Sequence, residues 1–231
     1  MSTPVIIALD FESAAEARAL VRRFGSKGNH YKVGLQLLTE AGPEFVRELV
    51  QSGNEVFLDL KLHEIPSSVA GAVKAAGKLG VSMVTVHASA GSAVLRAAVA
   101  AARPFLQLRV LALTVITSLL DSDLPEIGLA PSVDAQVARL ASLAAAAQCH
   151  GVVASALEAT YLRRVLPEQT LIVCPGIQLR QPGETDQARV ATPESAAKAG
   201  ATHIVVGRAV TAAPDPVLAY HTAFTAFHDG L

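Results

Sequence analysis

Residues 56–73, VFLDLKLHEIPSSVAGAV, begin as an apolar run and then turn abruptly polar. The apolar part predicts a β-strand buried on both faces, because such strands are nearly continuous in Val, Ile and Leu. Asp59, Lys61, His63 and Glu64 nevertheless follow within six positions. So many ionisable groups at the carboxyl end of a buried strand indicate a functional site there.

Similar β-rich runs recur along the whole chain, with helical stretches between them. Together with the first, they cover residues 5–10, 31–35, 55–61, 83–88, 109–116, 151–156, 170–177 and 203–209. Ala-rich amphipathic stretches such as 13–24, 42–53 and 132–148 separate them. Ser132 and Thr192, the latter followed by Pro, stand where a helix N-cap is expected.

Eight strand–helix repeats predict a (β/α)₈ TIM barrel. No composition break or linker divides the chain, so we expect one domain over residues 1–231, a length common for such barrels. A doubly wound open sheet is the alternative. It is weakened because no GxGxxG dinucleotide motif follows the first strand.

The amino-acid composition disfavours several classes of function. Hydrophobic residues are 51% and charged ones 17%, and 19 Lys and Arg face 20 Asp and Glu, which disfavours nucleic acid or a membrane as the main partner. The N-terminus has no basic region, and its apolar run is too short for a signal peptide or a membrane span. Two cysteines form no disulfide framework, and Cys174 is expected to be a small buried hydrophobe. We therefore expect a cytoplasmic protein.

Charged residues end three neighbouring strands of the predicted barrel. The first strand ends in Asp10, the second carries Lys32, and Asp59 and Lys61 share a face of the third, because residues two apart in a strand point the same way. With Glu64 they would form an alternating array at the mouth of the barrel. A structural ion-pair network is the alternative, but buried charge networks stabilise folds weakly. Interleaved charges can keep a partly buried lysine charged, which suits a proton donor.

The other side of the predicted site has the character of a phosphate clamp. Gly207 and Arg208 follow the last strand, where barrels often bind phosphate; glycine lets the backbone approach an oxyanion, and arginine offers a planar fork. The polar connection 178–191, which holds Gln187, and the connection 117–131 are both longer than usual βα loops. Long loops at this end of a barrel are candidate lids.

No metal site is predicted. His63 lies in HEIPS, which lacks the second histidine of HExxH, and the spacing to His87 matches no recognised ligand pattern. His87 is expected to be a hydrogen-bonded histidine at the barrel mouth. His221 and His228 are expected on the surface of a C-terminal helix.

In their order along the chain, these motifs resemble the orotidine 5′-monophosphate decarboxylase family of the bacterial type. The segments that carry the resemblance are ALD at 8–10, YKVG at 31–34, FLDLKLHEIP at 57–66, LTVITS at 113–118, PGI at 175–177, DQ at 186–187 and VGRAV at 206–210. The resemblance implies a homodimeric (β/α)₈ enzyme that needs no cofactor. It would convert orotidine 5′-monophosphate to uridine 5′-monophosphate and CO₂, the last step of de novo pyrimidine biosynthesis.

The resemblance also implies roles for individual residues. Lys61 would protonate C6 as CO₂ leaves, beside Asp59. Asp10 and Lys32 would bind the ribose hydroxyls, and Glu64 would act in the active site of the partner subunit. The remaining substrate-binding candidates are Ile65 and Ser68 near the partner's site, Thr117 and Ser118 at the pyrimidine, Gln187, Gly207 and Arg208 at the 5′-phosphate, and Gln178 and Arg180 in the same region.

Three positions depart from the family pattern. Glu64 stands where the family usually has Asp, Gln178 where it has Arg, and Ser68 where it has Thr. Because of Glu64 and Gln178, a non-catalytic nucleotide-binding homologue remains an alternative function. A sugar-phosphate decarboxylase of the same superfamily, of the 3-keto-gulonate 6-phosphate type, is the other alternative, but Lys32 and the DQ pair at 186–187 favour the nucleotide enzyme.

Overall fold

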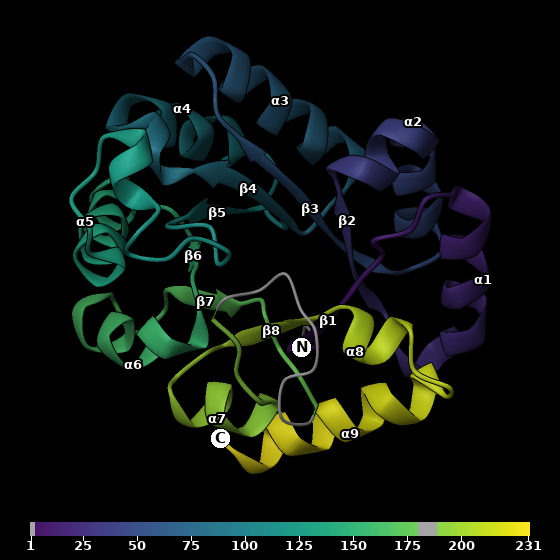
Figure 1. Cartoon of the computed structure of the whole chain (residues 1–231). Coiled ribbons are helices and arrows are strands. Elements are labelled where there is room, and N and C mark those ends of the chain that lie inside the picture. Colours follow the sequence, from purple (N-terminus) through teal and green to yellow (C-terminus); the bar gives the residue numbers. More distant parts are fainter. Residues whose placement is uncertain (1–2, 180–188) are drawn as a thin grey trace.

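Eight parallel strands close into a barrel in the computed structural model, which describes residues 3–179 and 189–231 (Figure 1). The strands are β1 (Val5–Ala8), β2 (His30–Gly34), β3 (Glu55–Leu62), β4 (Met83–His87), β5 (Arg109–Leu113), β6 (Gly151–Val153), β7 (Leu171–Cys174) and β8 (His203–Val206). Each pairs with the next, and β1 closes the ring on β8. The predicted TIM barrel and all eight of its strands are confirmed.

Helices surround this ring of strands (Figure 1). They are α1 (Ala14–Phe24), α2 (Leu35–Gln51), α3 (Pro66–Leu79), α4 (Ser92–Ala102), α5 (Val133–Ala146), α6 (Ala156–Val165), α7 (Pro193–Lys198), α8 (Arg208–Thr211) and α9 (Pro216–Asp229). Within the described residues, none of them is long and apolar enough to cross a membrane.

Two of the helices begin where the sequence predicts. Ser132 caps α5 by accepting a hydrogen bond from the N–H of Ala135, and Thr192 caps α7 in the same way. The predicted helix over 42–53 is wrong at its start, because α2 begins at Leu35. Gly42, with φ of +69°, breaks the helical path in its middle, and the following Pro suits the first turn of a new segment.

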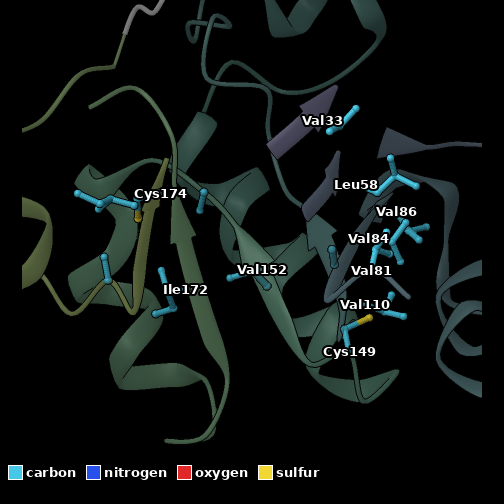
Figure 2. Packing of buried hydrophobic residues seen from close by; sticks show 14 of the residues in the cluster. Val33, Leu58, Val81, Val84, Val86, Val110, Cys149, Val152, Ile172 and Cys174 are labelled. Atoms are coloured by element: carbon cyan, nitrogen blue, oxygen red, sulfur yellow. The ribbon is translucent and has the colours of Figure 1, made fainter. Parts of the chain in front are cut away.

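Apolar side chains form two layers, one inside the barrel and one between strands and helices. The inner layer consists of Ile6, Ala8, Phe57, Met83, Leu111, Leu113, Val153, Val173 and Val205. Figure 2 shows part of the outer layer, which includes Val84, Val152 and Ile172. Cys149 and Cys174 are buried there as free thiols, and burial raises the pKa of Cys149 to about 12. The interpretation of Cys174 as a buried hydrophobe is confirmed.

The strand β2 is the exception in the inner layer, since its inward positions are polar. Tyr31 and Val33 belong to the outer layer, so alternation turns His30 and Lys32 toward the barrel axis. Lys32 lies toward the carboxyl end of the strand and His30 at the amino end. Lysine therefore replaces an apolar side chain at the end of the barrel where active sites lie.

Candidate active site

A cavity of about 540 Å³ lies at the carboxyl ends of the strands. Its walls come from seven strands, all except β4, or from the residues that follow them. The sequence-predicted site residues that border it are Asp10, Lys32, Asp59, Lys61, Thr117, Gln178, Gly207 and Arg208. The apolar part of its wall includes Ala8, Phe57, Leu113, Val153 and Val205, which also belong to the inner layer of the barrel. A polar rim on an apolar floor is a common design of small-molecule sites.

Four charged side chains form an alternating chain along one wall of this cavity. Lys61 Nζ lies 2.8 Å from Asp59 Oδ2, and Lys32 Nζ lies 3.8 Å from the same oxygen. Lys32 Nζ also donates to Asp10 Oδ1 at 2.9 Å. Asp59 is only 9% exposed, so this carboxylate is flanked by two ammonium groups in a largely desolvated position. Such a site carries strong local fields without a net excess of either charge.

The backbone at Lys61 adopts an unusual conformation that aims its side chain. Its φ is +50°, in the left-handed region that residues other than glycine seldom occupy. Between the pairs Leu58↔Val84 and Leu62↔Val86, β3 advances four residues while β4 advances two, so the strand bulges there. Bulges of this kind often redirect a side chain next to an active site.

Thr85 on β4 holds this bulge in place, although it is not among the site residues predicted from the sequence. Its hydroxyl donates to Asp59 Oδ1 at 2.8 Å and accepts from the backbone N–H of Lys61 at 2.9 Å. Thr85 is fully buried. The available signal was one hydroxyl residue in the otherwise apolar run 83–86, because a buried hydroxyl needs hydrogen-bond partners.

The opposite wall is suited to an anion. Gly207 directly follows β8, and a Cβ placed on it would meet no atom within 4 Å, so the space beside its backbone is open to a ligand. Arg208 begins α8 and borders the same space, as do Gln178 and Thr211. Thr211 was not predicted, since α8 is too short to show a helical period in the sequence.

Several predicted residues lie elsewhere. Glu64, Ile65, Ser68 and Ser118 are exposed and do not border the cavity of their own barrel. Hydrogen bonds from the Ser68 hydroxyl and the Ile65 N–H lower the pKa of the Glu64 carboxyl. Arg180 and Gln187, together with most of the predicted lid at 178–191, lie outside the described residues.

His63 and His87 stand close together beside the charged wall. Their ring centroids are 5.3 Å apart, and Ser89 Oγ lies 2.6 Å from His87 Nδ1. The predicted hydrogen-bonded role of His87 is confirmed. Burial lowers the pKa of His87, and the nearby His63 and Lys61 lower it further. In the part of the chain that the structure describes, no group of three or more His, Cys, Asp or Glu gathers in a way that could hold a metal ion.

Comparisons with known proteins agree with this geometry. The sequence model of the "Orotidine 5′-phosphate decarboxylase / HUMPS family" matches residues 3–223. The orotidine 5′-phosphate decarboxylase of Nitrosomonas europaea is 46% identical over 213 residues, which cover 92% of either chain. That of Chromohalobacter salexigens is 45% identical over 227 residues, covering 96% of this chain and 94% of the relative.

A solved structure gives the same result. The crystal structure of orotidine 5′-phosphate decarboxylase from Lactobacillus acidophilus matches with a TM-score of 0.88 at 33% identity, over 98% of this chain and 99% of the other. The resemblance and the enzyme class predicted from the third-strand motif are confirmed by these matches. The chain therefore belongs to the orotidine 5′-phosphate decarboxylase / HUMPS family.

Proposed function

We propose that this chain decarboxylates orotidine 5′-monophosphate to uridine 5′-monophosphate and CO₂, with Lys61 as the proton donor. One observation carries the proposal. Lys61 Nζ lies 2.8 Å from Asp59 Oδ2 on the wall of the cavity, in a chain 46% identical to a protein named orotidine 5′-phosphate decarboxylase. A lysine placed next to a carboxylate in a partly desolvated cavity suits proton delivery.

The reaction needs a positive charge near C6 and one proton for that carbon. The bond between C6 and the carboxylate breaks heterolytically, CO₂ leaves, and the electron pair stays on C6. Lys61 stabilises this negative charge, transfers an ammonium proton to C6, and takes a proton back from solvent as product leaves. Asp59 holds Lys61 and disfavours a second carboxylate beside it. Because the array Asp10–Lys32–Asp59–Lys61 supplies the charges, we propose that the reaction uses no cofactor.

The rest of the substrate would lie across the cavity. Asp10 and Lys32 would bind the ribose hydroxyls, Thr117 the pyrimidine, and Arg208 the 5′-phosphate. Phosphate binding is remote from C6, and its energy can be used to stabilise the transition state through the enclosed geometry. Further proposed contacts come from Ser118 at the pyrimidine, and from Gln178, Arg180, Gln187 and Gly207 near the phosphate.

We further propose a homodimer that works in the cytoplasm and performs the last step of de novo uridylate biosynthesis. Glu64 and its neighbours Ile65 and Ser68 are exposed and do not border their own cavity, which leaves them available to a second copy of the chain. Glu64 would complete the partner's active site. Both cysteines are buried thiols, in keeping with a reducing compartment.

The test is direct. Purified protein is mixed with orotidine 5′-monophosphate, and the loss of the substrate's absorbance is followed. Lys61→Ala should lower kcat by more than the roughly 10²–10⁴-fold typical of a general acid, because charge stabilisation is lost with the proton. Alanine and lysine both carry a Cβ, so the substitution adds no backbone strain at this position. The matched control is Lys74→Ala, which removes an exposed lysine of α3 and should leave turnover unchanged.

Three results would contradict the proposal. Turnover of Lys61→Ala within about tenfold of wild type would remove Lys61 from the mechanism, since an essential acid contributes more than that. A wild-type protein that leaves orotidylate intact but releases CO₂ from 3-keto-gulonate 6-phosphate would instead be a sugar-phosphate decarboxylase. Binding of the nucleotide without any turnover would indicate a non-catalytic homologue.

A further inference from the structure

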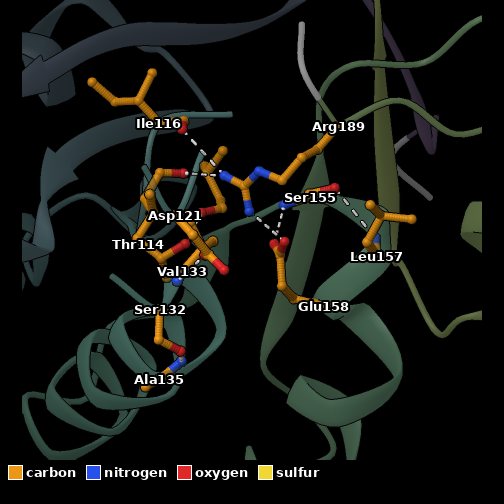
Figure 3. Close-up of polar contacts among 12 residues, drawn as sticks. Thr114, Ile116, Asp121, Ser132, Val133, Ala135, Ser155, Leu157, Glu158 and Arg189 are labelled. Carbon is orange, nitrogen blue, oxygen red and sulfur yellow. Dashed lines mark hydrogen bonds and ion pairs between the residues drawn. The ribbon is translucent and has the colours of Figure 1, made fainter. Parts of the chain in front are cut away.

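A buried arginine lies behind the cavity, outside the set of residues that border it. Arg189 is 8% exposed, and its Nη1 forms an ion pair with Glu158 Oε1, a carboxylate that is 6% exposed (Figure 3). Its Nη2 donates to the backbone oxygens of Val115 at 3.3 Å and Ile116 at 3.1 Å. One guanidinium thus joins the connection after β5, the first turn of α6 and the connection after β7.

Glu158 is itself fixed by the start of α6. It accepts a hydrogen bond from the N–H of Ser155 at 2.7 Å, and Ser155 caps the same helix, so the two form a capping box. Burial raises the pKa of the Glu158 carboxyl, whereas the neighbouring Arg189 lowers it. The carboxylate is therefore a rigid anchor for the guanidinium, because its own position is set by the helix end.

The contacts of Arg189 lead directly to the cavity. Val115 and Ile116 immediately precede Thr117, and Ile116 and Thr117 both border the cavity on the side proposed for the pyrimidine. Arg189 lies two residues before Ala191, whose backbone oxygen accepts from the N–H of Gln178 at 2.9 Å, and Gln178 borders the side of the cavity proposed for the phosphate. The two sides of the substrate site are thus linked through one side chain.

Stability alone is a weak reason for this arrangement. A buried ion pair loses hydration that its mutual attraction often fails to recover, and apolar replacements of such pairs are frequently as stable. The same geometry is well suited to fixing one backbone arrangement, because a planar guanidinium donates in set directions to several acceptors at once.

We propose that Arg189 is a positioning residue for the proposed decarboxylation. Its guanidinium, oriented by Glu158, holds the backbone at Val115 and Ile116 so that the phosphate side and the pyrimidine side of the cavity adopt one arrangement together. This rests on the proposed function. Binding of the substrate phosphate then improves the placement of the pyrimidine, and this coupling depends on Arg189.

The experiment measures that coupling. For each variant, kcat/KM is determined for orotidine 5′-monophosphate and for orotidine, which lacks the phosphate. The value for orotidine 5′-monophosphate is divided by the value for orotidine, and this ratio is compared with that of wild type. Glu158→Gln retains the capping box but removes the ion pair, since glutamine also serves at that position. The double variant Glu158→Gln/Arg189→Met leaves no unpaired buried charge, so it remains informative if Arg189→Met folds poorly.

The matched control is Arg163→Met. Arg163 also clamps backbone oxygens, donating to Glu168 at 2.7 Å and to Thr170 at 2.8 Å, but it does so near the carboxyl end of α6, away from the cavity. A fold-level defect lowers both values of kcat/KM by one factor and leaves their ratio unchanged.

We expect Arg189→Met and the double variant to lower the ratio at least about fivefold, the lower end of typical coupling between two sites. Glu158→Gln should lower it by less, and Arg163→Met should leave it as in wild type. Equal losses for both substrates in Arg189→Met and in the double variant would overturn the proposal.

The positioning role can be separated from the proposed reaction. If wild-type protein decarboxylates neither substrate, the proposed function is wrong. The role of Arg189 is then decided by binding: the dissociation constant for uridine is divided by that for uridine 5′-monophosphate. A ratio that falls in Arg189→Met supports the role, and an unchanged ratio overturns it. Wild-type protein that binds uridine and uridine 5′-monophosphate equally overturns both proposals.

Discussion

At the residue scale, the sequence predicts which group Lys61 contacts but not the backbone conformation that places it there. Alternation along a strand correctly brings its ammonium group to Asp59, at 2.8 Å. The left-handed backbone at Lys61 and the bulge opposite Thr85 could not be predicted, because residues 58–62 alternate between apolar and charged side chains as a regular strand does. A strained residue of this kind costs about 1–3 kcal/mol and persists only where its surroundings hold it.

Thr85 is the residue that holds it, and its replacement is a direct test. Thr85→Val keeps the shape but leaves Asp59 Oδ1 and the N–H of Lys61 without this partner. Each buried polar group deprived of its partner costs about 1–3 kcal/mol. We therefore expect kcat for orotidylate to fall at least about tenfold, as misplacement of a catalytic group commonly does. Steady-state kinetics measure this, with circular dichroism as the check on folding.

Thr85→Ser is the matched control, because it retains the hydroxyl and removes only a methyl group. It should keep most of the wild-type kcat. If Thr85→Val and Thr85→Ser were equally impaired, packing rather than hydrogen bonding would be the contribution of Thr85, and the bulge would be held by other contacts.

At the element scale, the order of strands was predictable because apolar runs buried on both faces differ plainly from Ala-rich amphipathic stretches. Their exact ends were less so. The predicted strand over 203–209 ends at Val206, and Arg208 instead begins the short helix α8. Apolar character continues through Ala209 and Val210, so composition alone does not mark the boundary. The early start of α2 was hidden in a similar way by the break at Gly42.

The turn from β8 into α8 carries the proposed phosphate contact, and Arg208→Ala tests it. A hydrogen bond to a charged group contributes about 1.5–3 kcal/mol, so kcat/KM for orotidylate should fall at least about tenfold. The rate with orotidine should hardly change, because that substrate has no phosphate to bind. Arg22→Ala, which removes an exposed arginine of α1, is the control and should affect neither substrate. A wild-type protein that used orotidine as well as orotidylate would refute the phosphate clamp.

At the scale of the whole molecule, the two ends of the barrel carry different chemistry. His30, Glu55 and His203 begin β2, β3 and β8 at the end opposite the cavity. The rings of His30 and His203 have centroids 6.2 Å apart. Burial lowers the pKa of both histidines, that of His203 to about 4, and a positive charge on His30 also contributes to the lowered pKa of His203. The sequence placed His203 in a predicted strand and His30 directly before one, but their proximity depends on closure of the ring.

This end of the barrel should make stability depend on pH. Unfolded histidine takes up a proton near pH 6.5, whereas folded His203 does so only near pH 4. Between these values the unfolded chain binds more protons, so the contribution of His203 is complete above pH 6.5 and is lost as pH falls toward 4. The loss should be about 3 kcal/mol, from a shift of roughly 2.5 pKa units. Urea unfolding at a series of pH values measures it.

Comparison of two variants separates this effect from that of the carboxylates. His203→Gln should unfold with a flatter dependence on pH between 6.5 and 4, although His30 still contributes. His228→Gln, which changes an exposed histidine of α9, should follow the wild-type curve. Parallel curves for wild type and His203→Gln would show that His203 is protonated as readily in the fold as in the unfolded chain.

Glu64 poses the remaining question at this scale. It follows the third-strand motif by only a few residues, yet its side chain is exposed and does not border the cavity of its own barrel. A single chain contains nothing that reveals a residue's place in an assembly, because the same exposed carboxylate would suit a surface or an interface. The proposal that Glu64 acts in the partner's active site therefore needs a test on mixed dimers.

Complementation between two defective proteins provides that test. Lys61→Ala and Glu64→Ala are each expected to be nearly inactive as homodimers. In a mixed dimer, one site combines both lesions, while the other has Lys61 from one subunit and Glu64 from its partner. Random exchange of equal amounts makes about half of the dimers mixed, so activity should approach about a quarter of wild type, by the two-fold symmetry of the dimer. Were Glu64 to act in its own barrel, every site would retain one lesion. Exchange shown by mass spectrometry without any gain in activity would therefore place Glu64 outside the partner's site.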